Sequence, residues 1–281
     1  MNRQKRVLAI HDISGVGKCS LTVALPIISA AGIEASLLPT AVLSTHTGGF
    51  TGFTYRDLTE DIMPIVKHWE ELQVKFDGIY TGFLGSYEQI ELIMQTFERL
   101  KSEGTLIVVD PVMADEGELY KIFDKNFPAQ MKALCEKADI IIPNITEACL
   151  MTGEKYVDGP YTKEYIEKLL RRLGEFGVKQ AVLTGVYFDD KKLGAACYDC
   201  VSGKISYAMA EKIEGYYHGT GDIFGSVLVS AVIGGKTIVE AVQLAVDFTV
   251  GCIKRTKEAD TERRYGVNFE AGLAGLAERL R

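Results

Sequence analysis

The sequence predicts an α/β fold, a mostly parallel sheet with helices on both faces and a hairpin at one edge. Short apolar runs alternate with longer segments whose apolar residues recur three and four positions apart. Late in the chain this rhythm changes to two alternating runs separated by a turn. Strands separated by helices need right-handed crossovers, which cover both faces of a parallel sheet.

The first two thirds of the chain supply the expected parallel strands and the helices between them. The strands are expected at residues 6–10, 35–38, 78–81, 106–110, 140–143 and 181–184. The helices are expected at residues 21–31, 58–72, 86–101, 129–137, 144–151 and 162–174. We see no linker, low-complexity tract, internal repeat or early insertion into the sheet, so residues 1–281 are expected to form a single domain.

The last third of the chain is expected to add the hairpin and three helices. Residues 193–198 and 204–210 alternate apolar and polar side chains around a turn, which is typical of paired edge strands. Helices are expected from about residue 221 to 234, 238 to 257 and 269 to 280. Ligands of open parallel sheets bind beyond the carboxyl ends of the strands, so candidate residues are sought there.

Composition and charge exclude several classes of protein. The chain has 47% hydrophobic and 25% charged residues, values of an ordinary folded protein. Its 31 Lys and Arg against 38 Asp and Glu give a net charge of −7, without the basic surplus that a nucleic-acid partner requires. No signal peptide or membrane span is visible, so we expect a cytoplasmic protein with no membrane association and with its six cysteines reduced.

A first glycine cluster, at residues 14–20, follows the first expected strand but matches no known phosphate loop. A Walker A loop requires glycine where Asp12 stands and a hydroxyl where Cys19 stands. A dinucleotide fingerprint requires glycine where Ser20 stands, so an oxidoreductase that uses NAD lacks its motif. We expect a flexible turn whose backbone amides can approach a small ligand.

A second cluster, HGTGDIFG at residues 218–225, is more informative because it opens an apolar helix. The amides of Gly219, Thr220 and Gly221 are expected at the positive end of the helix dipole, which makes an anion site. Asp222 stands beside them and can be either a helix cap or a base. An anion cradle next to a base is what phosphoryl transfer to a hydroxyl needs.

With four further segments, this motif resembles the pyridoxal/pyridoxamine (vitamin B6) kinase family of the ribokinase superfamily. The segments are STHTGGFTG at 44–52, DGIYTGFLGSYEQ at 77–89, VDPVM at 109–113 and ADIIIPNITE at 138–147. They lie in the family's order and at similar spacing over nearly the whole chain. The resemblance implies a ribokinase-like three-layer sandwich and an enzyme that phosphorylates the 5′-hydroxymethyl group of pyridoxal, pyridoxine or pyridoxamine.

The resemblance also implies the catalytic and nucleotide-binding residues. Asp222 would take the proton of the hydroxymethyl group, and the backbone of Gly219 to Gly221 would hold the transferred charge. ATP would be the co-substrate, with ATP-binding positions at Asp110, Asn144, Glu147, Thr184, Gly185, Gly219 and Gly221. Asp110 and Glu147 would hold Mg²⁺ largely through water, in agreement with the preference of this ion for hard oxygen ligands. Whether a monovalent cation such as K⁺ takes part stays open.

The substrate side of the resemblance contains two departures from the family pattern. Thr47 and Gly48 lie in the loop that covers the pyridine ring in the family. Phe83 stands where many relatives have tyrosine, so a stacking ring is kept but the phenol is lost. Asp12 stands where serine is frequent, and it can pair with a ring nitrogen or an amine or be only a turn residue. His46 and His218 adjoin the site and are expected to be hydrogen-bonded loop histidines.

These departures leave the preferred vitamer open and keep several alternatives. A hydroxymethylpyrimidine kinase or another small-alcohol kinase of the superfamily is the nearest one. Sugar kinases usually carry lid strands early in the chain, which we do not expect here. A noncatalytic ligand sensor is the alternative from another class, and the intact motif at residues 219–222 argues against it. The resemblance also implies a homodimer.

Overall fold

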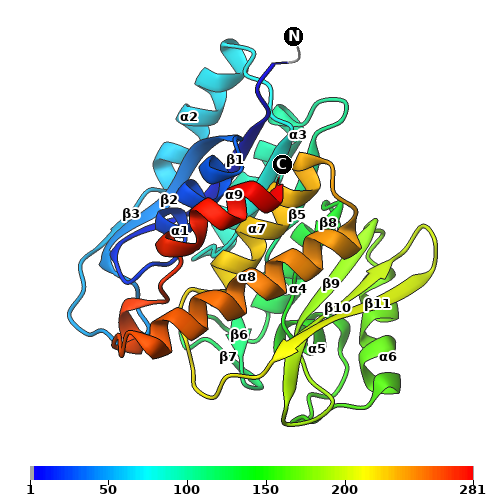
Figure 1. Ribbon diagram of the computed structural model, residues 1–281. Coiled ribbons are helices and arrows are strands. Elements are labelled where there is room, and N and C mark those ends of the chain that lie inside the picture. Colours follow the sequence, from blue (N-terminus) through cyan, green and yellow to red (C-terminus); the bar gives the residue numbers. More distant parts are fainter. Residues whose placement is uncertain (1–2, 281) are drawn as a thin grey trace.

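The computed structural model describes residues 3–280, and its main sheet confirms the α/β prediction (Figure 1). The strand order is β11-β10-β9-β8-β5-β4-β1-β2-β3, and the strands from β9 to β2 that neighbour one another in this order pair in parallel. The strand bounds are β1 Arg6–Val16, β2 Glu34–Thr45, β3 Tyr55–Asp57, β4 Gly78–Thr81, β5 Leu106–Val109, β8 Ile140–Ile141, β9 Gln180–Val186, β10 Lys192–Asp199 and β11 Lys204–Glu211.

Helices cover both faces of the sheet, which makes the predicted three layers (Figure 1). One layer contains α2 Thr59–Glu71, α3 Tyr87–Leu100, α4 Phe127–Cys135, α5 Ile145–Thr152 and α6 Lys163–Gly174. The other contains α1 Leu21–Ala30, α7 Thr220–Gly234, α8 Ile238–Glu258 and α9 Leu273–Leu280. The side-chain period of two in a strand explains the division, since Leu8 and Ile10 of β1 pack into the first layer and Val7 and Ala9 into the second.

The first two strands are longer than predicted, and β3 was not predicted. The polar, glycine-rich segment after Ile10 has the composition of a turn. It nevertheless continues as strand, because its backbone groups pair with the prolonged β2, with Ile13 opposite Val42 and Val16 opposite Thr45. β3 then pairs antiparallel with β2. The expectation that no extra strand is inserted into the sheet early in the chain is therefore wrong.

The predicted hairpin of β10 and β11 is confirmed and closes one edge of the sheet. A second, two-stranded sheet of β6 Ala114–Asp115 and β7 Glu118–Leu119 was not predicted. Its strands are too short to give a periodic pattern in the sequence. Among residues 3–280, no helix combines the length and the apolar character that a membrane span requires.

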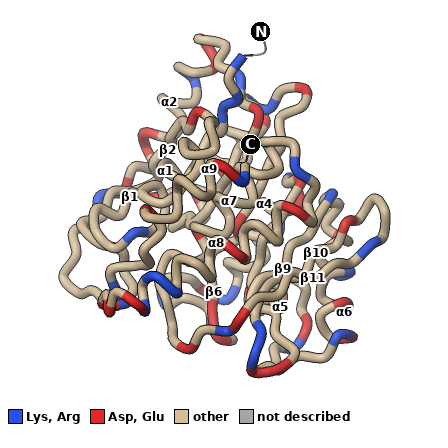
Figure 2. The backbone as a smooth tube through the Cα atoms, viewed as in Figure 1, with Lys and Arg blue, Asp and Glu red and all other residues tan. Residues whose placement is uncertain are grey.

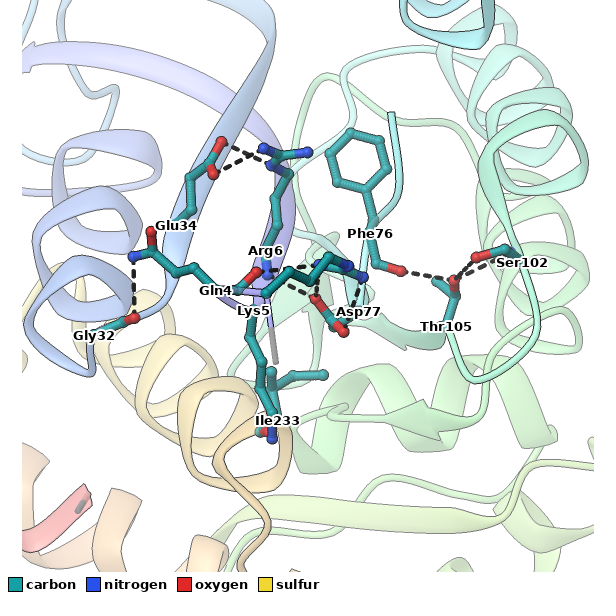
Figure 3. Close-up of polar contacts among 11 residues, drawn as sticks. Gln4, Lys5, Arg6, Gly32, Glu34, Phe76, Asp77, Ser102, Thr105 and Ile233 are labelled. Atoms are coloured by element: carbon teal, nitrogen blue, oxygen red, sulfur yellow. Dashed lines mark hydrogen bonds and ion pairs between the residues drawn. The ribbon is translucent and has the colours of Figure 1, made fainter. Parts of the chain in front are cut away.

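The sheet has an amino edge, where its parallel strands begin, and a carboxyl edge, where they end. These two edges differ in how their charged side chains are arranged. Acidic and basic segments are interspersed over the outer surface in the view of Figure 2. At the amino edge, Figure 3 shows Glu34 facing Arg6, and Asp77 accepting a hydrogen bond from the Arg6 amide at 2.7 Å. The Arg6 guanidinium donates a hydrogen bond to Glu34. This bond and the positive charge of Arg6 lower the pKa of Glu34. The predicted site lies at the carboxyl edge, where the charged side chains are arranged differently.

Candidate active site

The amino end of α7 has the backbone conformation that an anion site needs. Gly219 is left-handed with a φ of 77°, and a Cβ there would lie 2.2 Å from the Lys18 carbonyl oxygen, so only glycine fits. The first backbone hydrogen bond of the helix runs from the Ile223 amide to the Gly219 carbonyl, so the amides of residues 220–222 precede it. A Cβ on Gly221 would meet open space, which leaves this turn accessible.

Asp222 lies on this first turn, and its side chain is only 18% exposed. Burial raises its pKa to about 7, the nearby Asp12 charge also raises it, and a hydrogen bond from the Ser20 backbone opposes the shift. A carboxylate with a pKa near neutrality can accept a proton during a reaction and release it afterwards. Asp222 therefore has the chemistry that its predicted role as base requires.

Asp12 lies inside β1 rather than in a turn, so the interpretation of this residue as a turn residue is wrong. Its two carboxylate oxygens accept hydrogen bonds from Ser20 Oγ at 2.6 Å and Ser14 Oγ at 3.0 Å. Asp12 is 6% exposed. Burial raises the pKa of its carboxyl group, and the hydrogen bonds from the two serine hydroxyl groups partly offset this rise. The first glycine cluster thus contributes hydroxyl groups that orient an acid, and residues 14–16 of it continue β1.

The loop that contains Thr47 and Gly48 lies against the residue that precedes the anion site. A Cβ on Gly48 would lie 2.4 Å from the His218 ring, so glycine permits this close approach. The Gly48 amide donates to His46 Nδ1 at 3.0 Å, and His46 Nε2 lies 2.7 Å from the Arg264 carbonyl oxygen. His46 is therefore a hydrogen-bonded loop histidine, as expected, and it holds the exposed Thr47 beside the end of α7.

Phe83 lies in the loop after β4, and a residue that the sequence analysis missed brings a phenol to the same loop. A Cβ on Gly85 would lie 3.7 Å from Phe83 Cε1 and 3.6 Å from the Tyr55 hydroxyl oxygen. Tyr55 reaches this position because β3 pairs with the prolonged β2. The phenol absent at position 83 is thus present nearby, and the aromatic segment after the glycines at 48–52 is the only signal for it in the sequence.

Asp110 directly follows β5, and Glu147 lies in the first turn of α5, the helix that follows the neighbouring strand β8, as predicted. Asp110 is 8% exposed, and its pKa is raised well above its usual range by burial and by the charges of Glu147 and Asp222. Burial also raises the pKa of Glu147 to about 8, although its oxygens accept hydrogen bonds from the Asn144 and Met113 amides. Glu147 forms a capping box with Asn144, so it also stabilises the start of α5.

The charge balance at this edge fits a divalent cation. Within residues 3–280, no Lys or Arg lies at ion-pair distance from Asp12, Asp110, Glu147 or Asp222. The same residues contain no cluster of three or more His, Cys, Asp or Glu that could enclose a metal. Mg²⁺ is commonly bound by one or two carboxylates, several waters and substrate phosphates, so Asp110 and Glu147 fit this ion.

Thr184 and Gly185 lie beside Asn144 at the neighbouring strand ends, in agreement with their predicted position. Asn144 and Thr184 form an isolated parallel bridge, and the Thr184 amide donates to the Pro143 carbonyl at 3.0 Å. Gly185 is left-handed with a φ of 76°, and a Cβ there would meet open space. Asn144 itself is engaged in structure, because its side-chain amide donates to the Ala114 carbonyl and its oxygen accepts from the Glu147 amide.

Comparison with known proteins agrees with this geometry. The phosphomethylpyrimidine kinase family matches residues 25–267, which is most of the chain. The chain belongs to the phosphomethylpyrimidine kinase family. A candidate phosphomethylpyrimidine kinase from Bacteroides thetaiotaomicron, in a crystal form with pyridoxal, is 36% identical with a TM-score of 0.92, and the match covers 98% of this chain and 96% of that one.

Other proteins that resemble the chain are pyridoxal kinases by name. The crystal structure of pyridoxal kinase from Lactobacillus plantarum is 32% identical over 98% of each chain, with a TM-score of 0.90. The pyridoxine/pyridoxal/pyridoxamine kinase of Bordetella avium is 24% identical over 91% of this chain and 86% of that protein. The predicted membership in the vitamin B6 kinases and the ribokinase-like fold are therefore confirmed, and the chain is a kinase.

Proposed function

We propose that this chain transfers the γ-phosphoryl group of ATP to the 5′-hydroxymethyl group of a B6 vitamer. The observation that carries this proposal is the position of Asp222, a mostly buried carboxylate directly beside the open amide turn of α7. Asp12 affects the pKa of Asp222 through its charge, and the loop of Thr47 and Gly48 packs on His218. The base, the anion site and the proposed substrate-binding residues thus belong to one region at the carboxyl edge.

Each residue of the site is assigned one role in the reaction. Asp222 accepts the proton of the hydroxymethyl group while the alcohol oxygen forms a bond to the γ-phosphorus. The bond from this phosphorus to the bridging oxygen breaks, and ADP leaves with the electron pair. The amides of residues 220–222 stabilise the charge on the transferred group. Asp110 and Glu147 would hold Mg²⁺, which would supply positive charge for the nucleotide phosphates.

The substrate side favours a B6 vitamer and keeps one alternative. The Bacteroides relative was crystallised with pyridoxal, and Asp12 offers an oriented carboxylate to a substrate nitrogen. The hydroxymethylpyrimidine/phosphomethylpyrimidine kinase of Aquifex aeolicus, 26% identical over 67% of this chain, supports hydroxymethylpyrimidine as a second candidate substrate. Both substrates present a hydroxymethyl group on a nitrogen-containing ring, so the same base and anion site would serve either of them.

A substrate panel tests the proposal. The purified chain is supplied with ATP and Mg²⁺ together with pyridoxal, pyridoxine, pyridoxamine, hydroxymethylpyrimidine or ribose, and ADP and the phosphorylated product are measured. We expect kcat/KM for the preferred vitamer to exceed that for hydroxymethylpyrimidine by about tenfold or more. Preference for hydroxymethylpyrimidine or ribose would overturn the assigned substrate, and a chain that binds a vitamer without forming ADP would be a sensor.

The remaining proposals concern the setting of the enzyme. A homodimer and a cytoplasmic location are proposed from the resemblance to the B6 kinases and from the composition of the sequence. Kinetics in buffers that differ only in the monovalent cation would show whether K⁺ takes part.

A further inference from the structure

His11 is a completely buried polar residue directly behind the proposed base. It is 0% exposed and lies in β1, on the side of the sheet that α7 covers. Its ring packs edge-on against Tyr80, with centroids 4.5 Å apart. A Cβ on Gly82 would lie 2.2 Å from His11 Nδ1, so glycine is needed there to leave room for the imidazole. The ring is therefore held in a fixed position by β1 and β4.

Neither ring nitrogen of His11 has a hydrogen-bond partner within residues 3–280. Leaving a buried donor unpaired destabilises the folded state. Burial lowers the pKa of His11 to about 3, so the imidazole is neutral at physiological pH, with one N–H group and one lone pair. A neutral ring that cannot form an ion pair still needs an acceptor for its proton, and a buried residue of this kind requires an explanation.

The carboxylate of Asp222, the proposed base, is an acceptor that lies near this ring. His11 Nδ1 lies 3.9 Å from Asp222 Oδ1, too far for a hydrogen bond but about 1 Å from the usual distance of 2.9 Å. The other titratable groups that act on Asp222 or respond to its charge are Asp12, Cys19, Tyr80 and Asp110. The charge of Asp12 opposes the ionisation of Asp222, the charge of Asp222 raises the pKa of Asp110, and burial keeps the thiol and the phenol protonated.

We infer that His11 is a positioning residue, which donates Nδ1–H to Asp222 Oδ1 and so directs Oδ2 toward the substrate hydroxyl group. This inference rests on the proposed function, because it assigns His11 through the base. The hydrogen bond forms when the Asp222 side chain moves about 1 Å on ionisation. An ionised carboxylate accepts a hydrogen bond from the neutral imidazole more strongly than a protonated carboxyl group does. It favours the ionised form of a carboxylate that burial otherwise disfavours.

Two substitutions separate the hydrogen bond from the packing of the ring. His11→Leu removes the donor and keeps an apolar side chain of moderate size, whereas His11→Gln restores an uncharged N–H group. Thr249→Val is the matched control, because the Thr249 hydroxyl is also buried without a partner but lies on α8. Steady-state kinetics are measured with ATP and the preferred vitamer across a range of pH, together with thermal unfolding.

We expect His11→Leu to lower kcat by about tenfold to a hundredfold while the KM values change little, since a displaced base impairs the reaction rather than binding. The acidic limb of its kcat profile should move to higher pH. His11→Gln should recover most of the lost rate, and Thr249→Val should match the wild type. Equal losses in the Leu and Gln variants, or an unchanged rate and pH profile in His11→Leu, would overturn the inference.

A direct measurement keeps this test separate from the proposed function. Titration of the Asp222 carboxyl carbon by NMR reports its pKa without any turnover, and the signal is assigned with Asp222→Asn. His11→Leu should raise that pKa, and His11→Gln should return it toward the wild-type value. A wild-type chain with no kinase activity would refute the function, whereas an Asp222 pKa that does not respond to His11→Leu would refute the hydrogen bond.

Discussion

The two edges of the central sheet treat their carboxylates in opposite ways. At the amino edge, Asp77 pairs with Arg3 at 2.8 Å, Glu34 with Arg6 at 2.7 Å and Asp139 with Lys179 at 3.0 Å (Figure 3 shows the first two acids). At the carboxyl edge, the four acids at positions 12, 110, 147 and 222 have no Lys or Arg partner in the described part of the chain. Both edges are acidic, but only one of them is neutralised by the protein itself.

The difference shows which edge serves stability and which serves chemistry. A buried carboxylate without a cation costs folding free energy, which appears as the raised pKa of Asp110, Glu147 and Asp222. Such a cost is typical of functional sites, where the missing charge is supplied by a ligand. The paired acids of the amino edge should therefore govern stability, and the unpaired acids of the carboxyl edge should govern activity.

The largest effect is expected from Asp222→Asn, which keeps the shape of the carboxylate but removes its basicity. We expect kcat to fall by about 10² to 10⁴ while the affinities for ATP and vitamer persist, because general bases contribute rate rather than binding. Single-turnover kinetics and equilibrium binding measure the two quantities. An unchanged rate would exclude Asp222 as the base and would remove the functional half of the comparison between the edges.

A smaller effect on activity is expected from Asp110→Asn, with Asp139→Asn as its matched control. Both acids are 8% exposed, but Asp139 pairs with Lys179 and accepts a hydrogen bond from the Ile107 amide at 2.9 Å. Asp110→Asn should lower kcat by about tenfold to a hundredfold and raise the Mg²⁺ concentration needed for half-maximal rate. It should also raise the unfolding temperature without Mg²⁺, because the charge it removes is unpaired.

The control should behave in the opposite way. Asp139→Asn is expected to lower the unfolding temperature and to leave kcat and the Mg²⁺ dependence near their wild-type values. If both variants lost activity alike, or if both lost stability alike, the division of labour between the two edges would be contradicted.

The dependence of kcat on pH is expected to be moderate in size and to follow the ionisation of Asp222. Its pKa of about 7 means that the base becomes protonated as the pH falls below neutrality. The rate should then drop by about tenfold for each further pH unit, and a pH profile of kcat measures this limb. A profile that is flat between about pH 5 and pH 8 would show that the ionisation of Asp222 does not limit the reaction.

The same group makes a prediction for stability with a defined sign. A carboxyl whose pKa is raised on folding destabilises the folded state when it is ionised, so this cost is absent below its unfolded pKa and complete above about 7. Asp222→Asn should therefore be more stable than the wild type at alkaline pH, with a difference of up to a few kcal/mol at about 1.4 kcal/mol per pKa unit. The difference should disappear toward about pH 4.

The sequence predicts the layers of the fold, but not how far the early strands extend. Residues 11–16 have the polar, glycine-rich composition of a turn, and only their pairing with residues 39–45 makes them strand. This pairing is a tertiary contact that local composition does not report. For the same reason, β3 and its Tyr55 could not be found from periodicity.

The candidate site shows the same limit at the level of single residues. Asp222, Gly219 and Gly221 were predicted because their backbone and charge properties are local to one helix start. His11 was passed over because it offers no motif, and its importance depends on a 3.9 Å approach between β1 and α7. Residue type and spacing thus predict which groups are candidates for contact with a ligand, whereas a residue proposed to act through another side chain is found only from the packing.

The smallest effect on activity, with a measurable effect on stability, is expected from Asp77→Ala at the amino edge. Asp77 accepts hydrogen bonds from the Arg6 amide and from Arg3, and its side chain is 29% exposed. Losing a hydrogen bond to a charged group costs about 1.5 to 3 kcal/mol, so urea unfolding should show a loss of about 2 kcal/mol. Asp77→Asn, which keeps an acceptor for the Arg6 amide, should lose less. Because Asp77 precedes β4, whereas the candidate site lies beyond the carboxyl ends of the strands, kcat should stay within about twofold of the wild type, and a larger fall would show that the two edges are coupled.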